Sequence, residues 1–374
     1  GGKHAHWMSE CGEIDVFLFV DGSARGVQRM IGGVTGRQHM PPLFALGYHQ
    51  CRWNYDNATD IRSVDSEFDR REIPYDVLWL DIEHTDGKRY LTWDEEHFPD
   101  PVALQKHIGG KGRKMVLIVD PHLKVDEEYS VYENARNKGV LVRDRGGKRD
   151  FEGHCWPGTS SWVDYLTKEG RDFWAETLRD CETLCEDTFT WIDMNEPSCF
   201  NGPESTFQKD LMHAGGVEHR EVHNLFGHMM AAATSHGQSL KRPGKRPFLL
   251  TRSFYAGTQR YAAVWTGDNQ ATWEQLRAAV PMLLQLSVCG IHFCGADVGG
   301  FFGDPEEELL VRWYQSGAFY PFFRAHAHLE TKRREPWLYG PAAEDRIRQA
   351  IRGRYTLLPF IYTLFHLSSA RPLP

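Results

Sequence analysis

Short apolar runs alternate with amphipathic segments along most of this chain, and no other sequence feature restricts its fold as strongly. The apolar runs have the length of buried strands and occupy residues 43–49, 76–82, 114–120, 189–193, 248–253, 262–268 and 291–297. Segments with apolar residues at helical spacing lie between them, at 102–107, 171–185, 221–233 and 273–286. Strands that alternate with helices predict an α/β fold, a parallel sheet with right-handed crossovers.

Seven strands before a last helix at 343–367 favour a (β/α)8 barrel, a TIM barrel, over an open sheet. The chain ends at 368–374, where an eighth strand would belong, so we expect that strand to be very short or the barrel to be incomplete there. The connection at 121–188 is long for one crossover and predicts an inserted excursion over the barrel mouth. We therefore predict one barrel domain over residues 43–374.

Residues 1–42 follow a different pattern. The segment 13–20, E-I-D-V-F-L-F-V, begins with alternation and ends as an apolar run, which is typical of a strand. Four apolar residues then recur at helical spacing between positions 27 and 34, before two prolines at 41 and 42. We predict that residues 1–42 are the end of an N-terminal β-sandwich domain and a linking helix.

The composition argues against several classes of protein. Of the 374 residues, 41% are hydrophobic and 25% are charged, which fits a globular domain with a substantial core. The net charge is −8 and there is no basic block, so no nucleic acid partner is expected. No apolar run approaches the roughly 18 residues of a membrane-spanning helix, so no membrane partner is expected. The eight cysteines form no paired C-x-x-C signature of a structural zinc site.

Acidic residues follow several of the predicted strands. Because the carboxyl ends of parallel barrel strands meet at one mouth, these side chains are expected to converge there. Packing does not require so much negative charge in one place, and Arg252, Arg324 and His326 would offset only part of it. The acids are Asp81, Asp120, Asp193, Asp268 and Asp297.

Two kinds of chemistry use such a mouth. Carboxylate oxygens suit a magnesium or calcium ion, and a pair of carboxyl groups, one ionised and one protonated, suits glycoside hydrolysis. Tryptophans beside the acids, at 79, 191 and 265, favour a sugar because their faces stack on pyranose rings. Asp193 is the first candidate for the ionised carboxylate, and Glu196 is an alternative from residue pattern alone. A strand end with no catalytic role also remains open.

A series of motifs runs in order through nearly the whole chain. They are H-W-M-S-E at 6–10, L-G-Y-H-Q-C-R-W-N-Y at 46–55, W-L-D-I-E at 79–83, G-H-C-W-P-G at 153–158, W-I-D-M-N-E-P-S at 191–198, W-T-G-D at 265–268 and C-G-A-D-V-G-G-F-F at 294–302. The series resembles glycoside hydrolase family 31, the retaining α-glucosidases.

The resemblance implies a role for each matching residue. Asp193 matches the nucleophile and Asp268 the general acid/base of a double displacement, and Glu196 is expected to orient Arg252. No metal or other cofactor is implied. The positions that would hold or enclose a terminal glucose are Asp81, Ile118, Trp156, Trp191, Met194, Arg252, Trp265, Asp297, Phe301 and His326.

Within the family, the resemblance implies an enzyme that trims α-1,3-linked glucose from N-glycans in the endoplasmic reticulum lumen, with a non-catalytic β subunit as partner. Residues 1–4 lack the apolar core of a secretory signal. The resemblance also implies further β domains before and after the barrel, as glucosidases of this kind carry them. Two alternatives stay open: a catalytically silent carbohydrate-binding fragment, and a related α-glycosidase such as an α-xylosidase.

Overall fold

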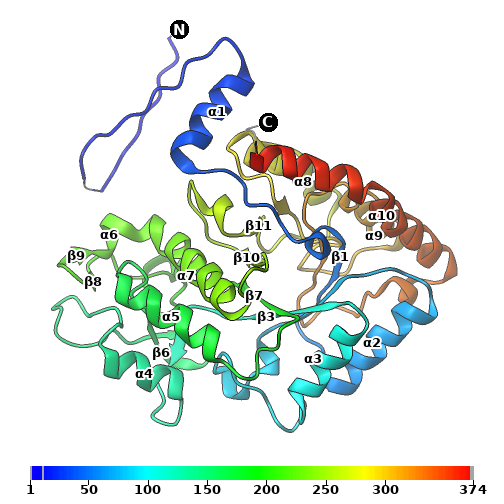
Figure 1. Cartoon of the computed structure of the whole chain (residues 1–374), viewed down its shortest axis with the longest axis horizontal. Helices are drawn as coiled ribbons and strands as arrows, with labels where there is room; N and C mark the ends of the chain where they lie inside the picture. Colours follow the sequence, from blue (N-terminus) through cyan, green and yellow to red (C-terminus); the bar gives the residue numbers. More distant parts are fainter. Residues whose placement is uncertain (1, 11, 371–374) are drawn as a thin grey trace.

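Eight parallel strands form one curved sheet in the computed structural model, which describes residues 2–10 and 12–370 (Figure 1). From β1 to β12 each strand of this sheet pairs with the next in chain order, and the last strand, β13, pairs with the first. The strands are β1 (Tyr48–Gln50), β2 (Val77–Leu80), β3 (Lys114–Ile118), β7 (Thr188–Ile192), β10 (Leu249–Thr251), β11 (Ala263–Trp265), β12 (Cys294–Gly295) and β13 (Phe323–Ala325).

The sheet is nearly closed into a barrel, with one seam between β12 and β13 that has no regular ladder. Two backbone hydrogen bonds cross this seam: the Phe322 amide donates to the Cys294 carbonyl at 3.0 Å, and the Val298 amide donates to the Arg324 carbonyl at 3.1 Å. The predicted TIM-barrel architecture is therefore confirmed.

The predicted position of the eighth strand, at residues 368–374, is wrong, whereas the expectation that this strand is very short is confirmed. The eighth strand is β13, which precedes the last helix, whereas residues 368–370 end that helix and residues 371–374 lie outside the described residues. Only three residues make up β13, and its centre is the charged Arg324, so the segment lacks the apolar run of a buried strand. Buried arginines of this kind cannot be recognised from hydropathy.

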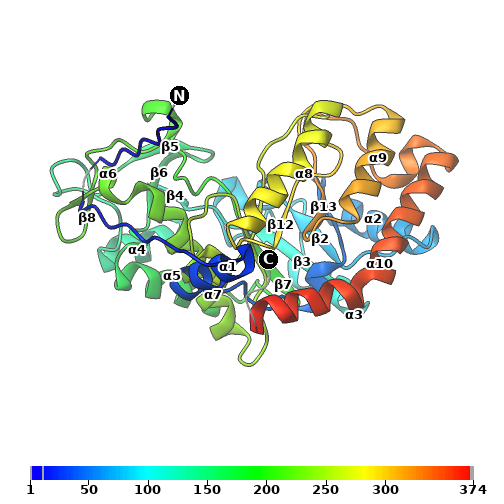
Figure 2. The same ribbon diagram turned by 90° about the horizontal axis from the view of Figure 1, so that it is seen from above.

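Helices lie around the outside of the sheet and connect its strands (Figures 1 and 2). Several begin at a polar side chain that accepts a hydrogen bond from the first turn, as Asn57, Asp100, Thr167 and Thr272 do. The helices between strands are α2 (Ala58–Arg70), α3 (Pro101–Gly110), α5 (Lys168–Asp180), α7 (Phe226–Lys241), α8 (Trp273–Val288) and α9 (Glu307–Gly317), and α10 (Pro341–Ala370) follows β13.

Two excursions leave the barrel on one side (Figure 2). The first follows β3 and contains β4 (His122–Lys124), α4 (Ser130–Lys138), β5 (Gly153–Cys155) and β6 (Gly158–Trp162), whose strands form an antiparallel sheet in the order β4–β6–β5. It lies within the predicted 121–188 segment, and α5 then returns to the barrel. The second excursion, between β7 and α7, was not predicted. It contains α6 (His219–Val222), β8 (Met212–His213) and β9 (Val217–Glu218).

The N-terminal region contains the predicted linking helix, α1 (Ala24–Thr35). The predicted strand at 13–20 is wrong, because the structure assigns no strand there and Val16 and Leu18 are 77% and 85% exposed. An isolated segment cannot form a strand, since its backbone groups need the hydrogen bonds of a neighbouring strand. Assignment of residues 1–42 to a β-sandwich domain stays a prediction.

Arg354, on α10, links this last helix to the segments that precede β1 and β13, the first and last strands of the barrel. Its fully buried guanidinium donates to the carbonyls of Leu46, Ala318, Tyr320 and Pro321 at 2.7–3.1 Å. Burial lowers the pKa of Arg354 only to about 10, so the group keeps its charge at neutral pH. Four carbonyl groups therefore depend on one side chain.

We expect Arg354→Met to lower the free energy of unfolding by about 3 kcal/mol or more, because buried carbonyls lose their donors. Urea unfolding at neutral pH measures this change. Arg346→Met on the same helix is the matched control, since the Arg346 side chain is 59% exposed, and its effect should stay within about 0.5 kcal/mol. Equal effects of the two substitutions would contradict this account of Arg354.

Candidate active site

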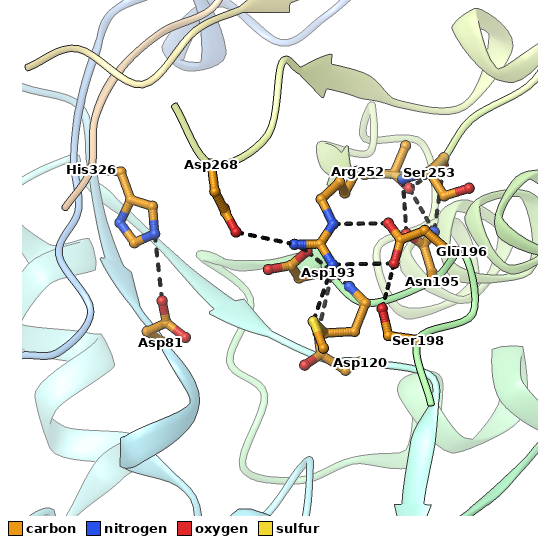
Figure 3. Close-up of polar contacts among 12 residues, drawn as sticks. Asp81, Asp120, Asp193, Asn195, Glu196, Ser198, Arg252, Ser253, Asp268 and His326 are labelled. Carbon is orange, nitrogen blue, oxygen red and sulfur yellow. Dashed lines mark hydrogen bonds and ion pairs between the residues drawn. The ribbon is translucent and has the colours of Figure 1, made fainter. Parts of the chain in front are cut away.

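The carboxyl ends of the barrel strands carry the acidic residues singled out in the sequence. Each acid lies within three residues of its strand's end, and parallel strands bring these ends to one mouth. Figure 3 shows Asp120, Asp193 and Asp268 near Arg252, and Asp81 beside His326. Asp81 follows β2, Asp120 follows β3, Asp193 follows β7, Asp268 follows β11 and Asp297 follows β12.

Asp193 and Asp268 both contact the same nitrogen of Arg252. Nη1 of Arg252 is 2.8 Å from Oδ1 of Asp193 and 3.7 Å from Oδ2 of Asp268. These two oxygens therefore lie no farther apart than the sum of the contacts, about 6.5 Å, which fits the roughly 5–5.5 Å of retaining glycosidases better than the 6.5–9.5 Å of inverting ones.

Glu196 holds the other edge of the same guanidinium. Its Oε1 accepts from Nε of Arg252 at 2.8 Å and its Oε2 accepts from Nη2 at 3.1 Å, so the pair is bidentate. The Ser198 hydroxyl also donates to Oε2, at 2.7 Å. The prediction that Glu196 orients Arg252 is confirmed. Asp193, in contrast, has an oxygen, Oδ2, to which no side chain or amide in the described ranges donates.

Met194 directs the Asp193 carboxylate. Its φ of 58° is in the left-handed region, which is uncommon for a residue with a side chain and costs of order 1 kcal/mol. The Met194 amide donates to Oδ1 of Asp193 at 2.8 Å, and the Met194 sulfur lies 3.1 Å from Nη2 of Arg252. The tight turn after β7 therefore fixes the carboxylate beside the guanidinium.

The floor of the mouth is a buried arginine among aromatic rings. The Arg324 guanidinium carbon lies 4.9 Å from the ring centres of Trp79 and Trp191 and 5.2 Å from that of Trp265. Its Nη2 donates to Oδ1 of Asp297 at 2.8 Å. Sequence reasoning named Arg324 only as a charge that offsets the acids, and the aromatic neighbours became evident only in the structure.

Several polar atoms of this floor are buried without a hydrogen-bond partner among the described residues. They are the second oxygen of Asp297, Nδ1 of His326, Nε and Nη1 of Arg324 and the indole nitrogens of Trp191 and Trp265. Nε2 of His326 is 3.6 Å from Oδ2 of Asp81, which is too long for a hydrogen bond. Buried polar groups normally have partners, so a cluster of unpaired ones fits a site for a ligand with many hydroxyl groups.

Aromatic side chains line the rim. The Phe301 ring centre lies 5.1 Å from that of His326 and 6.4 Å from that of Trp53, with the Phe301 and Trp53 rings nearly parallel. Trp156, on the turn between β5 and β6, contacts Trp53 edge-on at 5.5 Å. Trp156 therefore belongs to the same aromatic group as Trp53, a residue that sequence reasoning did not single out although it lies in the 46–55 motif. Ile118 is buried at the end of β3, in register with Trp191.

Residues 38–364 match the TIM-barrel domain of glycosyl hydrolases family 31. The chain belongs to this family. It is 55% identical over 98% of its length to a probable glucan 1,3-alpha-glucosidase of Arabidopsis thaliana, and 54% identical over 97% of its length to neutral alpha-glucosidase C of Homo sapiens. It spans 40% of the length of each of these relatives.

Comparison with solved structures agrees with this family assignment. The family 31 chain matches the crystal structure of an ER glucosidase II heterodimeric complex, of a catalytic subunit with the binding domain of a regulatory subunit, with a TM-score of 0.93 and 47% identity. The match covers 95% of this chain and 39% of that chain. Crystal structures of a glucosidase II alpha subunit with α3-Glc2 or Glc1Man2 bound match with TM-scores of 0.92 and 0.93.

Burial controls the ionisation of the family 31 site. It raises the pKa of Asp193 to about 6, although the positive charge of Arg252 acts in the other direction and lowers this pKa. Burial also raises the pKa of Asp268, although that side chain is the more exposed of the two, at 37% against 15%. Burial raises the pKa of Asp81 and lowers that of His326, so His326 is a neutral imidazole at neutral pH.

Within the described ranges, no cluster of three or more histidine, cysteine, aspartate or glutamate side chains has an arrangement that could hold a metal ion. Likewise, none of the helices described here is both long enough and apolar enough to cross a membrane.

Replacement of Arg252 should change the ionisation of Asp193. We expect Arg252→Met to raise the pKa of Asp193 above about 6, by about one unit or more, because the cation that favours the carboxylate is lost. The γ-carboxyl chemical shift of Asp193, followed by NMR in protein with isotope-labelled aspartate, measures the pKa. Arg312→Met, on the outer helix α9, should leave it unchanged. An unchanged pKa in Arg252→Met would rule out this electrostatic role.

Proposed function

We propose that this chain is the catalytic barrel of a retaining α-glucosidase that hydrolyses terminal, non-reducing α-linked glucose. The observation that carries the proposal is the shared contact of Asp193 and Asp268 with one nitrogen of Arg252, which keeps the two carboxyl groups close enough for a double displacement. The family 31 relatives named as α-glucosidases support the same reaction.

In the first step, Oδ2 of Asp193 attacks the anomeric carbon while the glycosidic bond breaks. The leaving oxygen takes the proton of Asp268, and glucose becomes esterified to Asp193. In the second step, ionised Asp268 takes a proton from water, whose oxygen attacks the anomeric carbon and releases Asp193. Two inversions give retention.

The electrostatics of the site suit this sequence. Arg252 stabilises the ionised form of Asp193 before the attack. Once Asp193 is esterified its charge is gone, so the pKa of Asp268 falls and favours its role as a base in the second step. Asp268 thereby acts first as an acid and then as a base.

The unpaired polar atoms of the floor would bind the glucose hydroxyl groups. In this proposal the second oxygen of Asp297 and the Asp81 carboxyl face the hydroxyls, and His326, Trp191 and Trp265 supply ring nitrogens. Arg252 would complete the polar set. Ile118, Met194, Phe301 and Trp156 would enclose the sugar ring with apolar surface.

The finer assignments are proposals as well. We propose that the substrate is α-1,3-linked glucose on N-glycans, since relatives carry the name glucan 1,3-alpha-glucosidase and solved neighbours hold α3-Glc2 or Glc1Man2. The neighbouring heterodimer with a regulatory subunit supports a non-catalytic β subunit as partner and the endoplasmic reticulum lumen as location. We also propose residues 1–42 as the end of a preceding domain and 43–374 as the barrel.

Loss of the nucleophile tests the proposed reaction. We expect the whole chain to hydrolyse p-nitrophenyl α-glucoside with retention, and Asp193→Asn to lower kcat by at least about 10⁴-fold because no covalent intermediate can form. Asp86→Asn, on a side chain that is 63% exposed, should keep its activity. Binding of glucosides without turnover by the unmodified chain would favour the silent fragment, and faster hydrolysis of the α-xyloside would favour an α-xylosidase.

The pH dependence of kcat/KM gives a separate test. Asp193 must be ionised, so activity should be lost as pH falls through about 6. Asp268 must be protonated, so activity should also be lost as pH rises past its own raised pKa. Initial rates across the pH range measure both limbs, and an acidic limb near the ordinary aspartate value of about 3.9 would contradict the assignment of Asp193.

A further inference from the structure

A fully buried carboxyl group lies directly behind the proposed nucleophile. Oδ1 of Asp120 accepts a hydrogen bond from the backbone amide of Asp193 at 3.0 Å. Oδ2 of Asp120 lies 2.6 Å from the hydroxyl of Tyr90, and that hydroxyl lies 2.8 Å from Nε2 of His122. Figure 3 shows Asp120 below Asp193, on the side away from Asp268. The four residues form one continuous chain of polar contacts.

Asp120 lacks the neighbour that a buried carboxylate needs. In the described part of the chain no lysine or arginine pairs with it, and the guanidinium of Arg252 contacts Asp193 instead. The ionisable groups that face Asp120 are Asp193, Asp81, Tyr90, His122 and Cys155.

None of these groups supplies a positive charge. Two are acids, and burial lowers the pKa of His122 to about 3, so this imidazole is neutral. An ionised carboxylate without water or a cation is unfavourable, and a second ionised carboxylate beside it makes it more so. Burial, and then the charge of Asp193, raise the pKa of Asp120 in agreement with this geometry.

We propose that Asp120 is a positioning residue with a neutral carboxyl group: its Oδ2 proton is donated to Tyr90, and its Oδ1 holds the backbone amide of Asp193. Tyr90 in turn donates its proton to Nε2 of neutral His122. In the opposite arrangement Tyr90 donates to an ionised Asp120 and Nε2 of His122 donates to Tyr90, so the two arrangements differ in the charge on Asp120 and in the tautomer of His122.

A neutral residue is useful at this position. The backbone of Asp193 precedes the left-handed Met194, so an additional hydrogen bond is needed to hold it. Asp120 supplies that bond without a second negative charge, which would raise the pKa of Asp193 further. This inference rests on the proposed role of Asp193 as nucleophile.

Two substitutions of Asp120 separate its shape from its charge. Alanine removes both hydrogen bonds, and we expect Asp120→Ala to lower kcat by about 100-fold with little change in KM, because the nucleophile is misplaced. Asparagine has the shape and the neutrality of the protonated acid, accepts from the Asp193 amide and donates to Tyr90. Asp120→Asn should therefore recover most of that loss.

The pH profile distinguishes the two charge states. If Asp120 is neutral, Asp120→Asn leaves the acidic limb of kcat/KM where it is in the unmodified chain. If Asp120 is ionised, its removal lowers the pKa of Asp193 and moves this limb to lower pH, which would overturn the proposal. Unchanged kcat in a folded Asp120→Ala would also overturn it.

Tyr90→Phe tests the other end of the contact. The proton of Asp120 loses its acceptor, so kcat should fall several-fold with little change in KM. Tyr129→Phe is the matched control, because its equally buried hydroxyl donates at 2.8 Å to the carbonyl of Tyr90 and does not contact Asp120. We expect its kcat to stay within about twofold, and equal losses in both variants would contradict a specific role of the Tyr90 hydroxyl.

An infrared measurement reads the protonation of Asp120 without turnover. At pH 7 the difference spectrum between the unmodified chain and Asp120→Asn should contain a carboxylic acid band, and absence of that band would overturn the proposal. If the unmodified chain shows this band but does not hydrolyse the glucoside, the proposed function is wrong, whereas the proposal of a neutral Asp120 carboxyl group is still supported. The same spectrum decides the question if Asp120→Ala does not fold.

Discussion

The three-way contact of Arg252 with Asp193, Glu196 and Asp268 is the interaction on which the rest of the site depends. A guanidinium presents donors on two edges, so it can hold one acid in a bidentate pair and still contact two others. Glu196 fixes its orientation. The fixed cation then lets two further carboxyl groups approach each other within a partly buried mouth, where burial and mutual repulsion would otherwise disfavour the ionised form that Asp193 needs.

The barrel supplies the other half of this arrangement. Parallel strands place Asp193 and Asp268 at the ends of β7 and β11, which only β10 separates in the sheet, although the two residues are far apart in sequence. The last strand, β13, brings Arg324 into the floor, where three tryptophan rings surround its charge and Asp297 pairs with it. A cation below the mouth and another beside it balance part of the charge of the acids, which is why so many carboxyl groups can be placed together.

Sequence reasoning identified most barrel strands because each has an apolar run next to a helical pattern. It missed β13, whose centre is Arg324, since a charged residue is not an apolar signal. It also missed the second excursion, because β8 and β9 are only two residues long. It placed a strand at 13–20 from alternation alone, and alternation cannot show whether a neighbouring strand is present to pair with.

The sequence by itself determined the identity of the acids, their place at strand ends and the resemblance to family 31, because these depend on local order along the chain. Only the tertiary structure decided which nitrogen Asp193 and Asp268 share, which polar atoms of the floor have no partner and that Asp120 is buried without a cation. Those properties depend on distances between residues far apart in the sequence and on the exclusion of water, and both arise only when the barrel closes.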